Sequence, residues 1–266
     1  MNTKKKIMIL IGIYLCVFIP WLYFGQTKND YSTSDIDMTD SLKKEKDLEG
    51  KSIVTIGDSI TWLDGKSITN VGEINGYQKV LKDKGATIFS YGNSGGTYRL
   101  YNEKSDYKHR SIYQEIVVKR MFDFSNIDII TLFGGTNDIG AGMNLGLVDS
   151  LDPNTTFGAL NLLIDFLIQN NPQTEIILFS PIYSIEETRT PEKMQELVSG
   201  LEEIAKIKEI KFVDIYNNFP INPLSAPTLL YDGLHPNSLG MEIIGERFYK
   251  SILEIESAEE LMINAY

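Results

Sequence analysis

Five short runs of apolar and β-branched residues alternate with longer amphipathic stretches along the chain. The runs cover residues 53–56, 87–91, 127–133, 175–180 and 211–215. Most are continuously apolar, which is typical of strands in a sheet that is covered on both faces. The stretches between them are too long for hairpins and long enough for helical crossovers. This alternation predicts an α/β protein, a three-layer α/β/α sandwich around a mainly parallel five-stranded sheet.

Capping signals and apolar stripes indicate helices between and after these strands. Thr156 can cap one helix, Thr190 followed by Pro191 is typical of a second helix start, and a third is expected to begin near Ser238. These helices are expected to bury Phe157, Leu160, Ile164 and Leu167 in the first, Met194, Leu197, Val198, Leu201 and Ile204 in the second, and Leu239, Ile243, Ile244, Phe248 and Ile252 in the third.

The N-terminus carries a nearly continuous apolar segment, residues 7–24, preceded by Lys4, Lys5 and Lys6. A helix of this length spans about 27 Å, close to the ~30 Å hydrocarbon thickness of a bilayer. The lysines predict that the start stays in the cytoplasm and that the rest lies outside. Because the segment ends in bulky residues, an uncleaved signal anchor is favoured over the alternative of a cleaved signal peptide.

These features predict three parts and a single-pass location in the cell membrane. Residues 1–25 form the cytoplasmic start and transmembrane helix, residues 26–50 a flexible polar linker, and residues 51–266 an extracytoplasmic domain. The only cysteine, Cys16, lies inside the apolar segment, where we expect a membrane-buried thiol and keep a lipidated cysteine as the alternative. With one cysteine the chain can form neither an intramolecular disulfide nor a zinc–cysteine cluster.

The net charge of −11 narrows the range of partners. A nucleic-acid partner would need a basic face, and an anionic membrane surface would repel an acidic body. The sequence therefore predicts neither of these partners. It implies no metal and no organic cofactor, and it leaves the oligomeric state open.

Four motifs rich in glycine and polar residues stand out against the strand pattern. Residues 57–60 read Gly-Asp-Ser-Ile, residues 94–97 Ser-Gly-Gly-Thr, residues 134–138 Gly-Gly-Thr-Asn-Asp and residues 232–236 Asp-Gly-Leu-His-Pro. The first three follow the first three predicted strands. Because the carboxyl ends of parallel strands share one edge of a sheet, these motifs are expected to meet there.

The motifs supply the groups needed for acyl transfer through a covalent ester. Ser59 is the candidate nucleophile, and a serine hydroxyl needs a neighbouring base. The chain has two histidines; His235 is the candidate base, whereas His109 lies in a polar stretch and is expected to be solvated. Asp232 lies three residues before His235, a spacing that lets its carboxylate orient the imidazole.

Two further residues are candidates for the oxyanion hole. Gly95 can bring its backbone N–H close to an oxyanion, and Asn137 offers a neutral side-chain NH₂, with the Ser59 N–H as a third donor. Taken singly, each could also be an ordinary turn or helix cap. The aromatic rings of Trp62, Tyr98 and Tyr183 are candidate substrate contacts that could stack on sugars, and packing within loops explains them equally well.

Together the motifs resemble the four sequence blocks of the SGNH (GDSL-type) hydrolase superfamily over about residues 51–255. Ser59, Gly95, Asn137 and His235 match the four positions that define that superfamily, and Asp232 matches the third member of its triad. The resemblance implies a flavodoxin-like fold and a serine esterase.

The predicted function is therefore a membrane-anchored, extracytoplasmic serine esterase that cleaves small acyl esters, with O-acetyl groups on cell-surface carbohydrate favoured by the expected location alone. An O-acyltransferase that moves an acetyl group to a surface glycan is the first alternative, and a lipase or lysophospholipase is a second. A non-catalytic glycan-binding module is disfavoured because every catalytic group is present.

Overall fold

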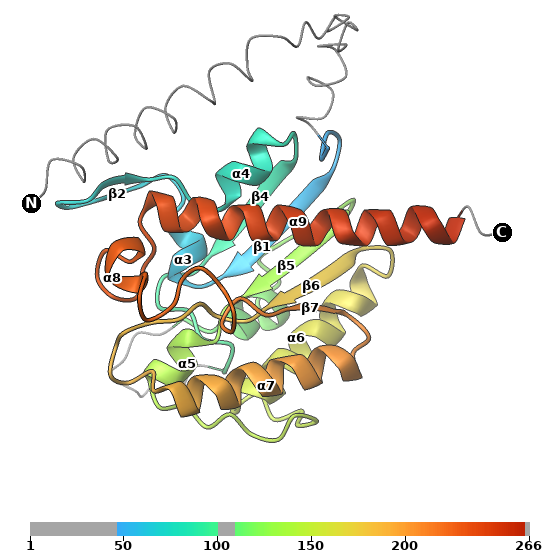
Figure 1. Cartoon of the computed structure of the whole chain (residues 1–266). Coiled ribbons are helices and arrows are strands. Elements are labelled where there is room, and N and C mark those ends of the chain that lie inside the picture. Colours follow the sequence, from blue (N-terminus) through green and yellow to red (C-terminus); the bar gives the residue numbers. More distant parts are fainter. Residues whose placement is uncertain (1–46, 101–109, 264–266) are drawn as a thin grey trace, which may run out of the picture. The chain divides into compact units, whose positions relative to one another are not determined.

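The computed structural model describes residues 47–100 and 110–263, and the five predicted strands form one sheet in it (Figure 1). The strands run β1 Ser52–Gly57, β4 Thr87–Gly92, β5 Ile129–Phe133, β6 Glu175–Phe179 and β7 Lys211–Val213. They lie in the order β4-β1-β5-β6-β7, and all neighbours are parallel. The predicted parallel five-stranded sheet is confirmed.

Helices surround this sheet, and a small hairpin extends from it. The helices are α3 Ser59–Trp62, α4 Gln78–Asp83, the π-helix η1 Gln114–Val118, α5 Thr136–Gly140, α6 Thr156–Asn170, α7 Pro191–Ile207, α8 Ala226–Leu229 and α9 Ser238–Ile263. The hairpin pairs β2 Lys66–Ile68 with β3 Gly72–Ile74. The sequence did not predict this hairpin, because its strands are short and largely exposed and so carry no apolar pattern.

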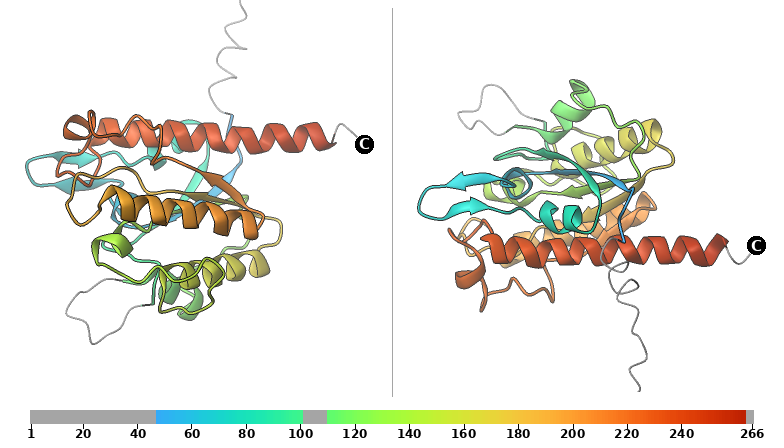
Figure 2. Two further views of the ribbon diagram at one scale, coloured as in Figure 1. Left: turned by 60° about the horizontal axis from the view of Figure 1, so that its bottom comes forward. Right: turned by 90° about the horizontal axis from the view of Figure 1, so that it is seen from above.

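Alternate residues of each central strand face opposite helical layers. In β5, Ile129 and Phe133 belong to one hydrophobic cluster, and Ile130 and Leu132 belong to the other. The first cluster includes residues of α4 and α9, and the second includes residues of α6 and α7, which cover the other face (Figures 1 and 2). Burial on both faces explains why the predicted strands are continuously apolar.

The two long crossover helices begin close to their predicted starts. α7 begins as predicted, with the Thr190 side chain accepting from the Lys193 N–H at 3.4 Å and proline in the first turn. α6 begins one residue earlier than predicted, because Thr155 rather than Thr156 caps it and accepts from the Gly158 N–H at 3.2 Å. The apolar stripes predicted for both helices are buried.

The last helix begins at the predicted Ser238, but one of its predicted core residues is wrong. Ile244, Phe248 and Ile252 are fully buried, whereas Leu239 is 54% exposed. Leu239 precedes Ile244 by five positions, which places it about 140° away around a helix that turns 100° per residue. The sheet fixes the orientation of α9, and Leu239 falls on its outer side.

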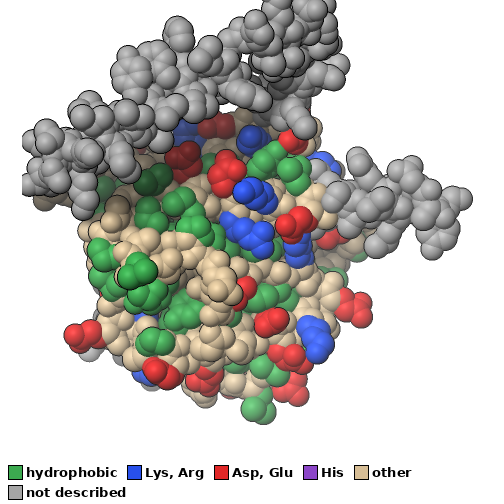
Figure 3. Space-filling view, viewed as in Figure 1, with side chains coloured by type: hydrophobic (Ala, Val, Ile, Leu, Met, Phe, Trp, Pro, Cys, Tyr) green, Lys and Arg blue, Asp and Glu red, His purple; other side chains and the backbone are tan. Residues whose placement is uncertain are grey.

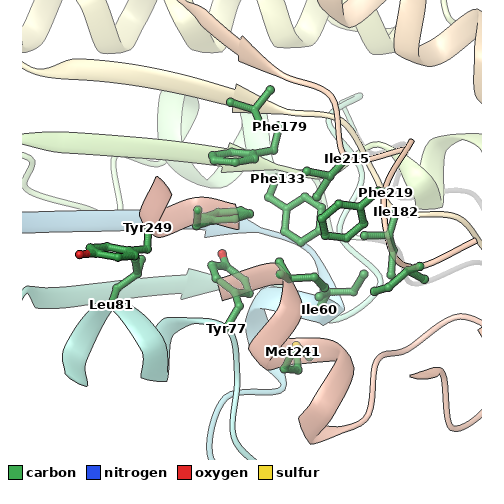
Figure 4. Packing of buried hydrophobic residues seen from close by; sticks show 14 of the residues in the cluster. Ile60, Tyr77, Leu81, Phe133, Phe179, Ile182, Ile215, Phe219, Met241 and Tyr249 are labelled. Atoms are coloured by element: carbon green, nitrogen blue, oxygen red, sulfur yellow. The ribbon is translucent and has the colours of Figure 1, made fainter. Parts of the chain in front are cut away.

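An aromatic cluster holds α9 against the sheet (Figure 4). The Phe248 ring stacks on Phe179 with 3.6 Å between ring centroids. It forms a T-shaped contact with Phe133 at 5.5 Å and a tilted contact with Tyr77 at 4.5 Å. Such ring contacts add to the hydrophobic gain of burial. Because His235 lies three residues before α9, this packing also holds the histidine loop near the sheet edge.

The folded body extends at least to Leu48, which is fully buried and whose N–H donates to the Lys84 carbonyl at 3.0 Å. This is three residues before the predicted boundary at residue 51. The predicted anchor and most of the predicted linker lie outside the described residues, and among those described no helix has the length and apolarity to cross a bilayer.

On the face shown in Figure 3, acidic and basic side chains are interspersed.

Candidate active site

The carboxyl ends of the three neighbouring strands β4, β1 and β5 lie in one register row. Gly57 at the end of β1 pairs with Gly92 of β4 and with Phe133 of β5. The motifs with the candidate nucleophile and the two candidate oxyanion donors leave the sheet directly after this row. The structure therefore brings three distant segments together at one edge, as the strand pattern predicted.

Ser59 opens the four-residue helix α3 immediately after β1 and is 7% exposed. The side chain of Asp58 caps this helix by accepting from the Ile60 N–H at 2.9 Å. A Cβ at Gly57 would lie 2.1 Å from Thr61 Oγ1 and 2.5 Å from the Phe133 carbonyl oxygen. Only glycine allows this close return of the helix over the strand end, so the Gly-Asp-Ser order sets the position of the hydroxyl.

A continuous chain of hydrogen bonds links Ser59, His235 and Asp232. His235 Nε2 lies 2.9 Å from Ser59 Oγ, although the two residues are 176 positions apart. His235 Nδ1 lies 2.7 Å from Asp232 Oδ2. The carboxylate holds the proton on Nδ1, so that Nε2 can accept the proton of the serine hydroxyl.

The loop that carries this pair is closed on itself. The Tyr231 N–H donates to the His235 carbonyl at 2.9 Å. Asp232 Oδ1 accepts from the N–H groups of Leu234 at 3.0 Å and His235 at 2.7 Å. Gly233 adopts a positive φ of 88°, which favours glycine. The spacing of three residues between acid and base therefore reflects a tight turn that the aspartate itself stabilises.

A second loop holds the histidine loop from outside. We call residues 180–190 the β6–α7 loop. In it, Ser184 Oγ and the Ile185 N–H both donate to the Gly233 carbonyl, at 3.0 and 2.9 Å. The turn between Asp232 and His235 is thereby fixed to the sheet through β6.

Burial and hydrogen bonding act in opposite directions on the carboxyl of Asp232. Burial alone would raise its pKa, but the hydrogen bonds from His235 and Leu234 outweigh that effect and hold the pKa below its ordinary value of 3.8. The group is therefore ionised at neutral pH. An ionised carboxylate stabilises an imidazolium on its Nδ1 side.

The two candidate oxyanion donors are joined by a hydrogen bond. Asn137 lies in the first turn of α5 and is 7% exposed. Its Nδ2 donates to the Gly96 carbonyl at 3.0 Å. Gly96 closes a tight turn by donating to the Asn93 carbonyl at 2.7 Å, and Gly95 within that turn has a positive φ of 73°. A side-chain amide has two N–H groups, so Asn137 can bind Gly96 and still offer one to an oxyanion.

Asp138, beside Asn137, connects the same loops from within the protein. Its carboxylate accepts from the N–H groups of Tyr98 at 3.1 Å and Arg99 at 3.3 Å and from Thr156 Oγ1 at 3.0 Å. Burial raises its pKa to about 6 despite these donors. Sequence reasoning assigned no role to this residue, because its partners are distant in the chain.

The three candidate substrate contacts differ in position. Trp62 is 39% exposed, and Lys66 Nζ lies 5.1 Å from the centre of its ring. Tyr183 is half-buried, with its ring 6.4 Å from that of Tyr216. Trp62 ends α3, the helix that Ser59 opens, and Tyr183 lies in the β6–α7 loop, which binds the histidine loop at Gly233, so both residues lie on elements that belong to the site.

Tyr98 does not fit the predicted substrate contact. It is 1% exposed and belongs to the hydrophobic cluster under α6 and α7. A Cβ at Gly134 would lie 3.3 Å from its ring. Tyr98 therefore supports the turn before Asn137 from below. His109, which we expected to be solvated, lies outside the described residues.

Two residues that the sequence analysis missed also contact the site. The Tyr231 ring stacks on the His235 imidazole, with 5.7 Å between centroids and 17° between planes. Arg189 is 8% exposed and donates to Thr136 and Asn137. An arginine just before a helix start gave no signal in the sequence.

Within the described part of the chain, no group of three or more His, Cys, Asp or Glu residues could hold a metal ion.

Residues 55–243 match the sequence pattern of the GDSL-like lipase/acylhydrolase family. The chain belongs to this family. The match contains all four motifs in full, and it makes the protein a GDSL-type hydrolase that acts on ester bonds. No curated protein sequence is significantly similar to the chain.

Solved structures support the GDSL-type fold. A lipase/acylhydrolase from Enterococcus faecalis is 20% identical and covers 76% of this chain and 95% of its own, with a TM-score of 0.51. A variant of an acetyl xylan esterase from Geobacillus stearothermophilus is 21% identical, with coverages of 77% and 95% and a TM-score of 0.52. A GDSL-like lipase from Bacteroides uniformis is 20% identical, with coverages of 77% and 96% and a TM-score of 0.56. At these identities the likeness concerns the fold.

Proposed function

We propose that this protein is a serine esterase that removes small acyl groups, foremost O-acetyl, from cell-surface carbohydrate, with its body held outside the cell by the N-terminal segment. The observation that carries the proposal is the unbroken chain from Ser59 Oγ through His235 to Asp232, at 2.9 and 2.7 Å. A hydroxyl in this setting can be activated as a nucleophile.

In the first half-reaction, Ser59 Oγ attacks the ester carbonyl carbon while its proton passes to His235 Nε2. The carbonyl oxygen becomes an oxyanion that accepts hydrogen bonds from the Ser59 and Gly95 N–H groups and from Asn137 Nδ2. His235 then gives its proton to the alcohol oxygen as the carbon–oxygen bond breaks. The alcohol leaves, and the acyl group remains on Ser59 as an ester.

In the second half-reaction, water replaces the alcohol. His235 Nε2 takes a proton from the water as its oxygen attacks the acyl carbon, and the same donors hold the new oxyanion. Collapse of the intermediate returns the proton from His235 to Ser59 Oγ and releases the carboxylic acid. Throughout, the Asp232 carboxylate stays ionised and stabilises the imidazolium.

The exposure of the site favours a large, polar substrate that approaches from outside. The side chains of His235 and Asp232 are 21% and 44% exposed, so the triad lies at the surface. Trp62, at the end of the nucleophile helix α3, has a partly exposed ring, and such a ring can stack on the apolar face of a sugar. The acetyl xylan esterase among the similar structures supports carbohydrate esters as the class to test first.

The first experiment measures hydrolysis of p-nitrophenyl acetate, butyrate and octanoate by the full chain in detergent. We expect acetate to be preferred and Ser59→Ala and His235→Ala to lose at least about 10³-fold in kcat. Ser67→Ala, which changes an exposed serine of the β2–β3 hairpin, is the matched control and should retain full activity. Equal activity of wild type and Ser59→Ala would refute the proposal, and a preference for octanoate would point to a lipase.

A second experiment identifies the acceptor. Acetylated glycans are supplied as substrates, and free acetate and acetyl groups on an added glycan acceptor are both measured. Release of free acetate supports the esterase, whereas faster formation of acetylated acceptor would identify an acyltransferase instead.

Mass spectrometry of the mature N-terminus tests the anchor, since a start near residue 26 would mean a cleaved signal peptide.

A further inference from the structure

We propose that Arg189 is a positioning residue that orients the side-chain amide of Asn137 as an oxyanion donor. This inference rests on the proposed function, because an oxyanion hole has a role only if Ser59 attacks an ester. Arg189 lies 52 positions from Asn137, near the end of the β6–α7 loop and next to Thr190, which caps α7. None of the four motifs includes it.

Hydrogen bonds to the start of α5 and to the β6–α7 loop hold the Arg189 guanidinium. Arg189 Nε donates to Thr136 Oγ1 at 2.9 Å, and Nη2 donates to Asn137 Oδ1 at 3.4 Å. Nη1 donates to Thr188 Oγ1 at 3.2 Å and forms an ion pair with Glu186. All three nitrogens are therefore engaged, and two of them bind consecutive residues at the start of α5.

These contacts select one of the two orientations of the Asn137 amide. The oxygen and nitrogen of such an amide have nearly the same shape, so packing alone does not distinguish them. Arg189 can only donate, which requires the amide oxygen on its side. The Gly96 carbonyl can only accept, which requires the amide nitrogen on the opposite side. The pair therefore presents the NH₂ group toward the turn that carries Gly95.

The charge of Arg189 also strengthens Asn137 as a donor. The 3.4 Å separation from Oδ1 is long for a hydrogen bond, so the main effect is that of a cation next to a carbonyl dipole. A cation there draws electron density toward the oxygen and makes the amide N–H groups more positive. Arg189 is 8% exposed and Asn137 is 7% exposed, so water screens this interaction little.

The helix beside the guanidinium leaves space for it. A Cβ at Gly140, the last residue of α5, would lie 2.6 Å from Arg189 Nη2 and 2.7 Å from its Cζ. Any larger residue at this position must push the guanidinium away from Asn137. Gly140→Ala therefore displaces Arg189 without removing its charge, and it offers a second route to the same test.

The experiment compares ester hydrolysis by full-chain variants in detergent. Arg189→Met removes the charge and the donors and keeps much of the side-chain length. We expect its kcat to fall about 10- to 100-fold with KM changed less than about threefold, because a transition-state interaction is lost. Arg189→Lys should fall between wild type and Arg189→Met, because it restores a charge but not the planar fork. Arg247→Met, on the surface of α9, is the matched control and should match wild type.

A double-mutant cycle separates positioning from a general structural role. Asn137→Ala should lose about 10²- to 10³-fold in kcat. If Arg189 acts through Asn137, the Asn137→Ala/Arg189→Met variant should lose no more than about threefold beyond Asn137→Ala alone. Losses that multiply would overturn the inference, and so would an unchanged kcat in Arg189→Met. If Arg189→Met does not fold, the same cycle is run with Gly140→Ala.

The outcomes also distinguish this inference from the proposed function. An inactive wild type, or a Ser59→Ala variant that retains activity, overturns both. An active wild type that depends on Ser59, combined with an independent effect of Arg189, overturns only the positioning role.

Discussion

The buried carboxyl of Asp58 should make the stability of this protein depend on pH in a specific direction. Asp58 is 2% exposed, and burial raises its pKa from 3.8 to about 6, although the Ile60 N–H and the charges of His235 and Arg189 favour the ionised form. Below pH 3.8 the group is protonated in both the folded and the unfolded chain. Between 3.8 and about 6 only the folded chain keeps the proton. Its contribution to stability is therefore present in acid and lost as the pH rises through this window.

Asp58→Asn removes this titration and keeps an oxygen that can accept from the Ile60 N–H. Because one pKa unit corresponds to about 1.4 kcal/mol, a shift of about two units corresponds to roughly 3 kcal/mol. The free energy of unfolding of Asp58→Asn, relative to wild type, should therefore increase by roughly this amount between pH 4 and pH 7. At pH 7 the variant should be the more stable protein.

Urea denaturation followed by circular dichroism, at pH 4, 5, 6 and 7, measures this difference on the full chain in detergent. Asp149→Asn, at an exposed aspartate, is the control and should show no such trend. A difference between Asp58→Asn and wild type that stays constant with pH, or that falls as pH rises, would refute the reasoning. It would mean that the Asp58 carboxylate is stabilised in the fold as well as it is in water.

Three further changes test other parts of the structure. Phe248→Ala should lower the free energy of unfolding in urea by about 3–5 kcal/mol, because the ring is fully buried and stacks on Phe179. Gly135→Ala should cost about 1–3 kcal/mol in the same assay and lower kcat, because φ is 103° there and a Cβ would lie 3.1 Å from Leu197. Trp62→Ala should change stability by less than about 1 kcal/mol, because the ring is partly exposed, and should raise KM for an acetylated glycan more than for p-nitrophenyl acetate in steady-state kinetics.

Each of these three has a result that would count against it. A loss below about 1 kcal/mol in Phe248→Ala would mean that α9 is not held by the aromatic cluster. Unchanged stability and kcat in Gly135→Ala would show that α5 tolerates a side chain at this turn. An equal change of KM for both substrates in Trp62→Ala would exclude a contact specific to the sugar.

The central sheet could be predicted because burial on both faces requires apolar residues at consecutive positions of each strand. Ile53–Ile56 and Ile129–Phe133 are apolar at nearly every position, and alternate residues enter the two clusters. The β2–β3 hairpin has no continuous apolar run, because most of its residues face water. Leu239 was misplaced because an apolar residue at the start of a helix does not reveal which face will meet the sheet.

The candidate site was predictable to the extent that its chemistry is concentrated in short motifs. Ser59, Asp232 and His235 are the residue types that acyl transfer requires, and their order along the chain resembles that of a known superfamily. Arg189 and Asp138 were missed because each acts on residues far away in the sequence. For Tyr98 the sequence left substrate contact and packing open, because a tyrosine in a polar loop is compatible with both, and the structure places its ring in the core.

The sequence by itself determined the strands, the helix starts and the identity of the reacting groups, because these depend on local periodicity and on side-chain chemistry. Only the tertiary structure decided that Ser59 Oγ and His235 Nε2 lie 2.9 Å apart and that Arg189 approaches Asn137. Such distances depend on how the aromatic cluster positions α9 and on how the β6–α7 loop binds the turn at Gly233. Those contacts join segments that are remote in the chain, and no local pattern encodes them.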